Sequence, residues 1–241
     1  VISVMNGFRL DLTNRIIGLN SHLNIYSFDN EITNKQADEL ILNIDNSFFY
    51  QHYKSIETNG LIIKSNNSKG IMIKGYDEYD KNHYLFNSIN MGALIQNPKS
   101  EILIGDSLAN EMNLSVGDKV KIAIPKTDKT ILGNIPRFKT LEVVGVFDLG
   151  LYEYDSNLIF LSSELVRKLL LYDEDIYNKI EFFTSSPNEI ELFKNKVELE
   201  TSNLLLNFYS ISWKDQNKTL INALKVEKNV MFIILSLIIL V

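Results

Sequence analysis

The chain has 241 residues, of which 45% are hydrophobic and 22% are charged, and its formal net charge is −6 at pH 7. This composition is that of an ordinary globular protein, and the acidic balance argues against a general nucleic-acid binder, which needs a basic face. The lack of cysteine excludes disulfides, thiol catalysis and zinc–thiolate sites.

The N-terminal third begins with apolar residues at three- and four-residue steps, which predict an amphipathic helix over residues 1–20. These residues are Val1, Val4, Met5, Phe8, Leu12, Ile16 and Leu19. The next expected elements are a strand at 22–26, a helix at 32–44 and a strand at 48–56. Residues 60–64 and 70–74 predict a hairpin whose polar loop is 65–69.

The middle of the chain is rich in strand patterns. Residues 88–98 contain many turn formers and predict a boundary between two parts. The elements expected after it are a strand at 101–105, a helix at 106–113, strands at 119–124, 140–147 and 157–161, and a helix at 162–171. The strands 119–124 and 140–147 are predicted to pair antiparallel, with residues 125–136 as a long loop between them.

The C-terminal third predicts a strand at 177–183, a helix at 187–199 and a strand at 209–213. A last helix is expected to begin near Lys214, with Trp213 packed at its foot. It runs into eleven unbroken apolar residues, Met231–Val241. A membrane-spanning helix takes about 20 such residues. We therefore expect Met231–Val241 to be the first half of a transmembrane helix, so that the whole is an α+β domain between membrane helices.

Several short motifs resemble, in order and spacing, the periplasmic domain of lipoprotein-releasing permeases of the LolC/LolE family. They are Ser3-Val-Met-Asn-Gly-Phe8, Ile17-Gly-Leu19, Ile104-Gly105, Leu108-Ala109, Leu114, Gly117-Asp-Lys-Val120, Gly133-Asn-Ile-Pro136, Val144-Gly-Val-Phe147 and Val226-Glu-Lys-Asn229. Each motif is short, but together they cover nearly the whole chain.

This resemblance implies a permease subunit of an ABC transporter in the bacterial inner membrane, with the present domain in the periplasm. Its implied partners are a second permease subunit, a LolD-like ATPase subunit, the lipoprotein substrate, the membrane and a LolA-like periplasmic carrier. The chain has no Walker-type phosphate loop, so ATP hydrolysis is expected in another subunit. No catalytic set, metal site, cofactor or nucleic-acid partner is expected.

The implied fold is a macrolide-exporter-like periplasmic domain, in which a β-rich subdomain is inserted into a porter-like α+β subdomain. The expected parts are an N-terminal stalk helix at 1–20, the porter-like subdomain at 21–87 and 171–213, the inserted subdomain at 88–170, and a C-terminal stalk with a truncated transmembrane helix at 214–241.

The segment 119–139 contains six basic residues and one acidic residue, in a chain that is acidic overall. Physical reasoning alone leaves two roles open: a solvated hairpin kept soluble by lysines, or a site that steers an acidic partner surface. An extended hairpin here could protrude about 15–20 Å at ~3.3 Å per residue. The resemblance implies the second role, in which residues 125–136 form a hook that the carrier grips.

The implied hook residues are Ile131, Leu132, Gly133, Asn134, Ile135 and Pro136, and the implied pad beside the hook is Lys121, Phe138 and Lys139. The sequence departs from the family at the pad. Lysine stands where the family has arginine, which keeps the charge but loses bidentate geometry. Phe138 stands where an amide is usual.

Two further alternatives remain open, and a third is disfavoured. Val4, Met5 and Phe8 could contact lipoprotein acyl chains, or pack against the C-terminal helix, which we favour. The whole domain could also be a macrolide-exporter-like or cell-division-type permease domain that binds an adaptor or a cell-wall hydrolase. A membrane-tethered enzyme is disfavoured, because the sequence offers no nucleophile–base set.

Overall fold

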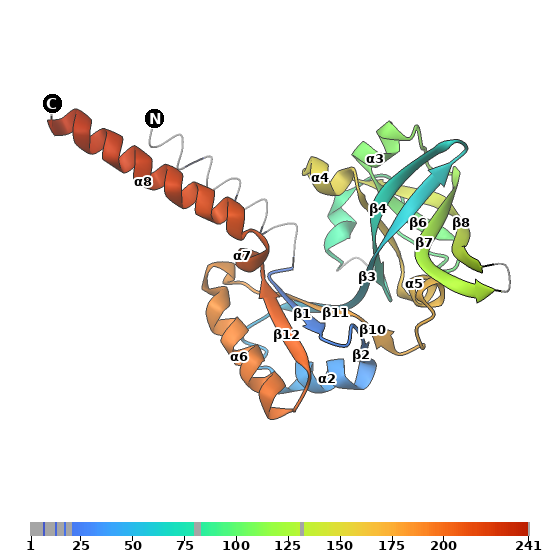
Figure 1. The fold of residues 1–241 in the computed structure, drawn as a ribbon, viewed down its shortest axis with the longest axis horizontal. Coiled ribbons are helices and arrows are strands. Elements are labelled where there is room, and N and C mark those ends of the chain that lie inside the picture. Colours follow the sequence, from blue (N-terminus) through green and yellow to red (C-terminus); the bar gives the residue numbers. More distant parts are fainter. Residues whose placement is uncertain are drawn as a thin grey trace. The chain divides into compact units, whose positions relative to one another are not determined.

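The computed structural model describes residues 21–79, 83–130 and 133–240, together with Gly7, Thr13 and Ile17. Helices and strands are mixed along this part of the chain, and strands often follow one another in pairs (Figure 1). The chain forms two compact units: unit 1 is Val1–Tyr26, Leu42–His52 and Glu181–Val241, and unit 2 is Ser27–Ile41 and Tyr53–Ile180. The subdomain boundaries expected from the sequence stay a prediction.

Unit 1 holds three neighbouring strands in the order β12–β1–β11 and two long helices, α6 and α8. Its elements are β1 (Leu23–Ser27), β11 (Lys179–Phe183), the 3-10 turn η2 (Pro187–Glu189), α6 (Ile190–Asn203), β12 (Phe208–Ser212), α7 (Trp213–Gln216) and α8 (Lys218–Leu240). Pro187 opens the turn that leads into α6, because its fixed φ suits a helical first turn.

The core of unit 1 is aromatic. The ring of Phe182 meets the rings of Phe49 and Phe193 at centroid distances of 5.0 and 5.5 Å. Trp213 is 3% exposed, and its indole N–H donates to the carbonyl of Pro187 at 2.7 Å. The expected packed position of Trp213 is thus confirmed.

The helix expected to start near Lys214 is divided in two. Ser212 and Asp215 form a reciprocal capping box that begins α7. The α7 turn then ends at Asn217, whose side-chain amide donates to the carbonyl of Trp213 at 2.8 Å, and α8 follows. A side chain that binds a backbone carbonyl in this way competes with helix continuation. Within the described ranges no helix combines the length and the apolar content that crossing a membrane requires.

Unit 2 is built on a closed ring of strands. The pairings run β3–β4–β9–β6–β8–β7, and β7 pairs in turn with β3. Closure gives each member a hydrogen-bonded neighbour on both sides over part of its length. The strands of the ring are β3 (Gln51–Lys64), β4 (Asn67–Tyr76), β6 (Glu101–Gly105), β7 (Lys119–Thr130), β8 (Gly133–Phe147) and β9 (Leu158–Ser162).

The other elements of unit 2 lie around this ring. They are β2 (Ile32–Thr33), α2 (Asn34–Asn43), η1 (Tyr84–Ser88), β5 (Ile89–Gly92), α3 (Asp106–Glu111), α4 (Tyr152–Asp155), α5 (Ser163–Leu170) and β10 (Ile176–Tyr177). The small strands β2 and β10 pair with each other, whereas β5 pairs with the end of β8.

The main hydrophobic core joins the ring to α3 and α5. The fully buried side chains at its centre include Ile62, Ile104, Ile122, Ile159 and Val166. Helix α5 is held in place by its caps: the hydroxyl of Ser162 accepts from the backbone N–H of Leu165, and Leu171 ends the helix in the left-handed conformation. The sequence predicted the Ser162 start of this helix.

A carboxylate secures α5 to the ring. Asp77, just after β4, accepts hydrogen bonds from the hydroxyl of Ser163, from the Arg167 guanidinium at 3.1 Å and from the Tyr177 hydroxyl at 2.5 Å. Burial, reinforced by the hydrogen bond to the Asp77 carboxylate, raises the pKa of Tyr177 to about 12. The Arg167 side chain is 12% exposed, so the Asp77 carboxylate compensates a positive charge that is largely removed from water.

Two local predictions are wrong, and one strand was not predicted. The predicted loop 65–69 is a tight turn, because β3 continues to Lys64 and β4 begins at Asn67, with Ser65 at φ 53°. The turn-rich stretch 88–98 contains β5. The segment 125–136, predicted as a loop, continues as strand through Thr130 and again from Gly133.

Candidate partner-binding ribbon

The strands β7 and β8 form a long antiparallel ribbon, seen side by side in Figure 1. The pairing runs from Lys119 opposite Glu142 to Thr130 opposite Gly133. Between Ile124 and Thr130 the ribbon extends about 20 Å at ~3.3 Å per residue. The pairing agrees with the extended hairpin considered for this segment.

The ribbon changes register where it leaves the core. Ile124 lies opposite Arg137, and the next pair is Thr127 with Pro136, so Pro125 and Lys126 have no opposite residues. Proline has no amide hydrogen to give to a ladder, and bulges are where strands tolerate it. A bulge also increases the local twist. The outer part of the ribbon therefore begins at a bulge, where the twist of the two strands increases.

The base of the ribbon is fixed by one face. Val120, Ile122 and Ile124 are at most 1% exposed and belong to the main core. Near the bulge, the Arg137 guanidinium donates to the carbonyl of Lys168 in the last turn of α5 at 2.9 Å. A cation is favourable at this end of a helix. Arg137 therefore anchors the ribbon and is half-buried.

The opposite face of the ribbon base is largely exposed, although Ala123 on it is buried. Across β3, β7 and β8, Leu61 lies opposite Ala123 and Ala123 lies opposite Phe138, so all three share one face. Leu61 is 46% exposed and Phe138 is 54% exposed. The adjacent row on the same face contains Ile63, Lys121 and Thr140.

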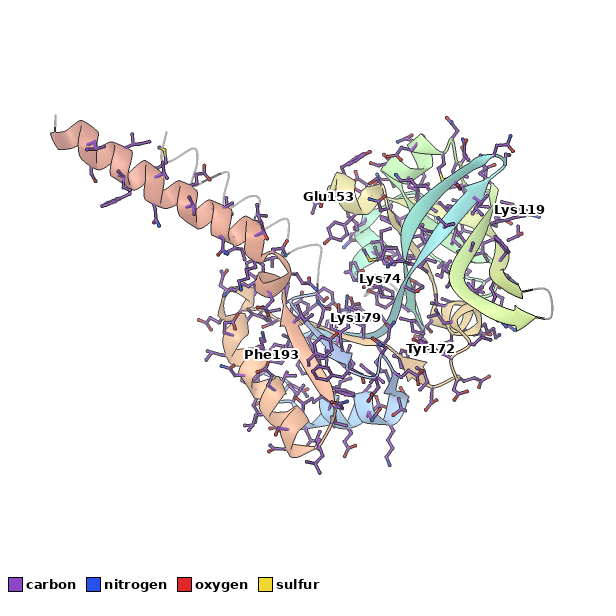
Figure 2. All side chains as sticks on the ribbon, in the orientation of Figure 1. Lys74, Lys119, Glu153, Tyr172, Lys179 and Phe193 are labelled. Carbon is purple, nitrogen blue, oxygen red and sulfur yellow. The ribbon has the colours of Figure 1, made fainter. Side chains whose placement is uncertain are left out.

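Lys119 precedes this row at the start of β7, where Figure 2 labels it. We call Leu61, Ile63, Lys119, Lys121 and Phe138 the outer patch. It combines exposed apolar area with the positive charges of two lysines. Glu142, which is paired with Lys119, adds one negative charge on the same face. Such a surface suits a partner with an apolar groove and an acidic rim.

The three residues expected to form a pad do not share one face of the ribbon, because side chains alternate between the two faces of a strand. Lys121 and Phe138 are on the outer patch. Lys139 lies opposite Ile122, in the row whose other members are buried, and is therefore on the other face of the ribbon. A partner that meets all three must reach around the edge of β8.

Leu61 and Ile63 were missed as site residues. Alternation around buried Ile62 could have placed both on the exposed face of β3. Their position beside Lys121 and Phe138 depends on the pairing of β3 with β7, which brings together strands far apart in the sequence. No local pattern reports that pairing.

The expected hook falls only partly within the described residues. Gly133, Asn134, Ile135 and Pro136 are backbone positions of β8, paired in turn with Thr130, Lys129, Asp128 and Thr127. Ile131 and Leu132 lie outside the described residues, and so do Val4, Met5 and Phe8.

No family model matches the chain. Among curated proteins, the chain is 25% identical over 99% of its length to the lipoprotein-releasing system transmembrane protein LolC of Neisseria meningitidis. It is 26% identical over 98% of its length to the protein of the same name from Buchnera aphidicola. The chain spans 58% of the length of each of these relatives.

Two solved structures share the fold. The periplasmic region of MacB from Actinobacillus actinomycetemcomitans matches 86% of this chain and 95% of its own, with a TM-score of 0.53 and 16% identity. The extracellular domain of the noncanonic ABC-type transporter YknZ from Gram-positive bacteria matches 80% of this chain and 100% of its own, with a TM-score of 0.51 and 13% identity.

These comparisons confirm the resemblance to the lipoprotein-releasing permeases, which the short motifs indicated. They also confirm the predicted fold class, an α+β domain like the macrolide-exporter periplasmic domain. At these identities, the two structural matches are evidence for the fold alone.

Proposed function

We propose that this chain is the periplasmic domain of an inner-membrane permease subunit in a lipoprotein-releasing ABC transporter. The main support for this proposal is the similarity of the chain, over 99% of its length, to a protein named as a lipoprotein-releasing system transmembrane protein. In this role the domain binds the carrier and takes part in delivering the lipoprotein to it. ATP hydrolysis belongs to a separate LolD-like subunit. A second permease subunit completes the membrane part.

The proposed delivery site is the β7–β8 ribbon. Its outer part, residues 126–136, acts as the hook that a LolA-like periplasmic carrier grips, and the outer patch lies at its base. The support is physical: the ribbon extends past a bulge, and exposed Phe138 and Leu61 lie beside Lys119 and Lys121. Apolar anchors flanked by charge are typical of binding sites. Lys139 contributes from the opposite face.

Val4, Met5 and Phe8 are proposed to pack against α8, with contact to lipoprotein acyl chains as the second role. Within α8, Leu220 and Leu224 are half-buried, whereas Val226 is 61% exposed.

A carrier pull-down tests the delivery site. The variant lacks residues 126–136, and the matched control carries Val116→Ala, an exposed residue in the turn before β7. Both variants are first checked for unchanged far-UV circular dichroism and melting temperature. We expect the deletion to abolish capture of a LolA-like carrier and the control to retain it. Full capture by the deletion variant would exclude the hook role and favour an adaptor- or hydrolase-binding permease domain.

A further inference from the structure

The outer part of the ribbon is held by two strands alone. In the part of the chain that the structure describes, β7 pairs with β3 only as far as Ala123, and β8 pairs with β5 and β6 only from Glu142 onward. Thr127–Thr130 and Gly133–Pro136 therefore pair only with each other. A two-stranded hairpin is marginally stable by itself. The backbone ladder alone thus does not fix the direction of this outer part against the rest of unit 2.

Arg137 lies where the two-stranded part begins. It is paired with Ile124 in the last step of the ladder before the bulge, and Ile124 is buried in the main core. The Arg137 guanidinium donates to the carbonyl of Lys168 at 2.9 Å. This carbonyl belongs to α5, which lies against β7 (Figure 1). Arg137 therefore joins the base of the outer part to a helix of unit 2.

The bond suits the end of a helix. The last carbonyls of a helix have no partner within it. In α5 the N–H of Tyr172 donates to the carbonyl of Arg167 at 3.0 Å, one residue before Lys168. The Arg137 guanidinium supplies a partner for the next carbonyl, and its positive charge is favourable at the C-terminal end of the helix. A hydrogen bond from a charged donor is about twice as strong as a neutral one.

The helix that receives this bond is itself well anchored. Leu165, Val166 and Leu169 bury one face of α5 in the main core. The hydroxyl of Ser162 caps the start of the helix, and Asp77 accepts hydrogen bonds from its first two turns. The ribbon is therefore attached to an element whose own position is fixed.

We propose that Arg137 is a positioning residue that sets the direction of the outer part of the ribbon from α5 and thereby the affinity for the carrier. The inference rests on the proposed function, because the carrier is the partner whose binding it affects. A partner that meets a ribbon of fixed direction does not have to order it, and such preorganisation lowers the cost of association. This role differs from the direct contacts proposed for Lys121, Phe138 and Lys139.

A distance measurement without the carrier tests the positioning. The 241-residue chain has no cysteine, so spin labels can be placed only at Lys129→Cys on β7 and at Glu153→Cys, an exposed position of α4. Double electron–electron resonance in a mild detergent gives the distribution of distances between the two labels. We expect Arg137→Gln to broaden or shift this distribution. Lys139→Gln, which removes the neighbouring positive charge, should leave it unchanged. An unchanged distribution in Arg137→Gln would overturn the proposal.

The affinity of the unlabelled variants for a purified LolA-like carrier tests the consequence. By isothermal titration calorimetry, Arg137→Gln should raise the Kd about tenfold at an unchanged melting temperature. Arg137→Lys keeps a cation at the helix end and is the second variant if Arg137→Gln lowers the melting temperature. In both variants the affinity should follow the distance distribution.

Two results of the titration would overturn the proposal. A loss of affinity with an unchanged distribution would make Arg137 a direct contact of the carrier. A changed distribution with an unchanged Kd would show that carrier binding does not depend on the direction of the ribbon. Failure of the unaltered chain to bind the carrier would refute the proposed function, whereas the distance measurement would still decide whether Arg137 sets that direction.

Discussion

Phe138 should dominate binding at the outer patch. It is 54% exposed, and a Phe side chain presents about 200 Å², so a partner can cover about 110 Å² of it. At about 25 cal/mol per Å² this burial is worth ~2.7 kcal/mol, equivalent to about 100-fold in Kd. Phe138→Ala should therefore raise the Kd of a LolA-like carrier by up to this factor. The stability of the domain should not change, because the ring is outside the core.

Isothermal titration calorimetry with the purified carrier measures this effect, and urea unfolding measures stability in parallel. Val116→Ala is the control, because Val116 is also exposed in unit 2 but lies outside the outer patch. A Kd within about twofold of the unaltered chain would show that no partner covers Phe138, and the outer patch would lose its main anchor. A fall in stability would instead make Phe138 a structural residue.

Three further predictions concern stability. Asp77→Asn should lower the free energy of unfolding by about 2 kcal/mol in urea titration, because Arg167 loses a charged hydrogen-bond partner; an unchanged midpoint would show that this network contributes nothing. Burial lowers the pKa of His22 below 6.5, and its ring accepts from the N–H of Thr184. The folded state then binds fewer protons than the unfolded state, so stability should fall as the pH drops below 6.5, and His22→Gln should flatten that slope. Gly105→Ala should cost about 2–3 kcal/mol in the same assay, since its Cβ would overlap backbone; a neutral effect would contradict the packing described.

The confirmed elements were predicted from clear local patterns of apolar residues and helix caps. The strand predicted at 101–105 is β6 without a shift in either bound, and α5 starts at the predicted Ser162 cap. The pairing of 119–124 with 140–147 is also confirmed. Apolar and polar residues alternate in 119–124 and at the start of 140–147, which indicated two strands. Such signals are local, and the sequence contains them in full.

The wrong predictions lie where turn-forming residues occur within segments that pair as strands. Gly133 and the two prolines at 125 and 136 indicate turns, yet the ladder of β7 and β8 passes through this segment by placing Pro125 in a bulge. Gly92 and the nearby Asn87 and Asn90 similarly indicate turns, although this segment contains β5. The outer patch could not be assembled from the sequence, because Leu61 meets Ala123 through a long-range pairing. Charge and apolar content located the ribbon, but only the register shows which residues share a face.

In the proposed function, a periplasmic carrier binds the outer part of the β7–β8 ribbon. Site-specific photo-crosslinking in the assembled transporter tests this binding, with a photoreactive residue in place of Lys129 on the ribbon and, separately, in place of Leu205, which is 92% exposed in unit 1. We expect a cross-link to the carrier from position 129 and none from position 205. Equal yields from the two positions, or a cross-link from position 205 alone, would show that the carrier does not bind the ribbon.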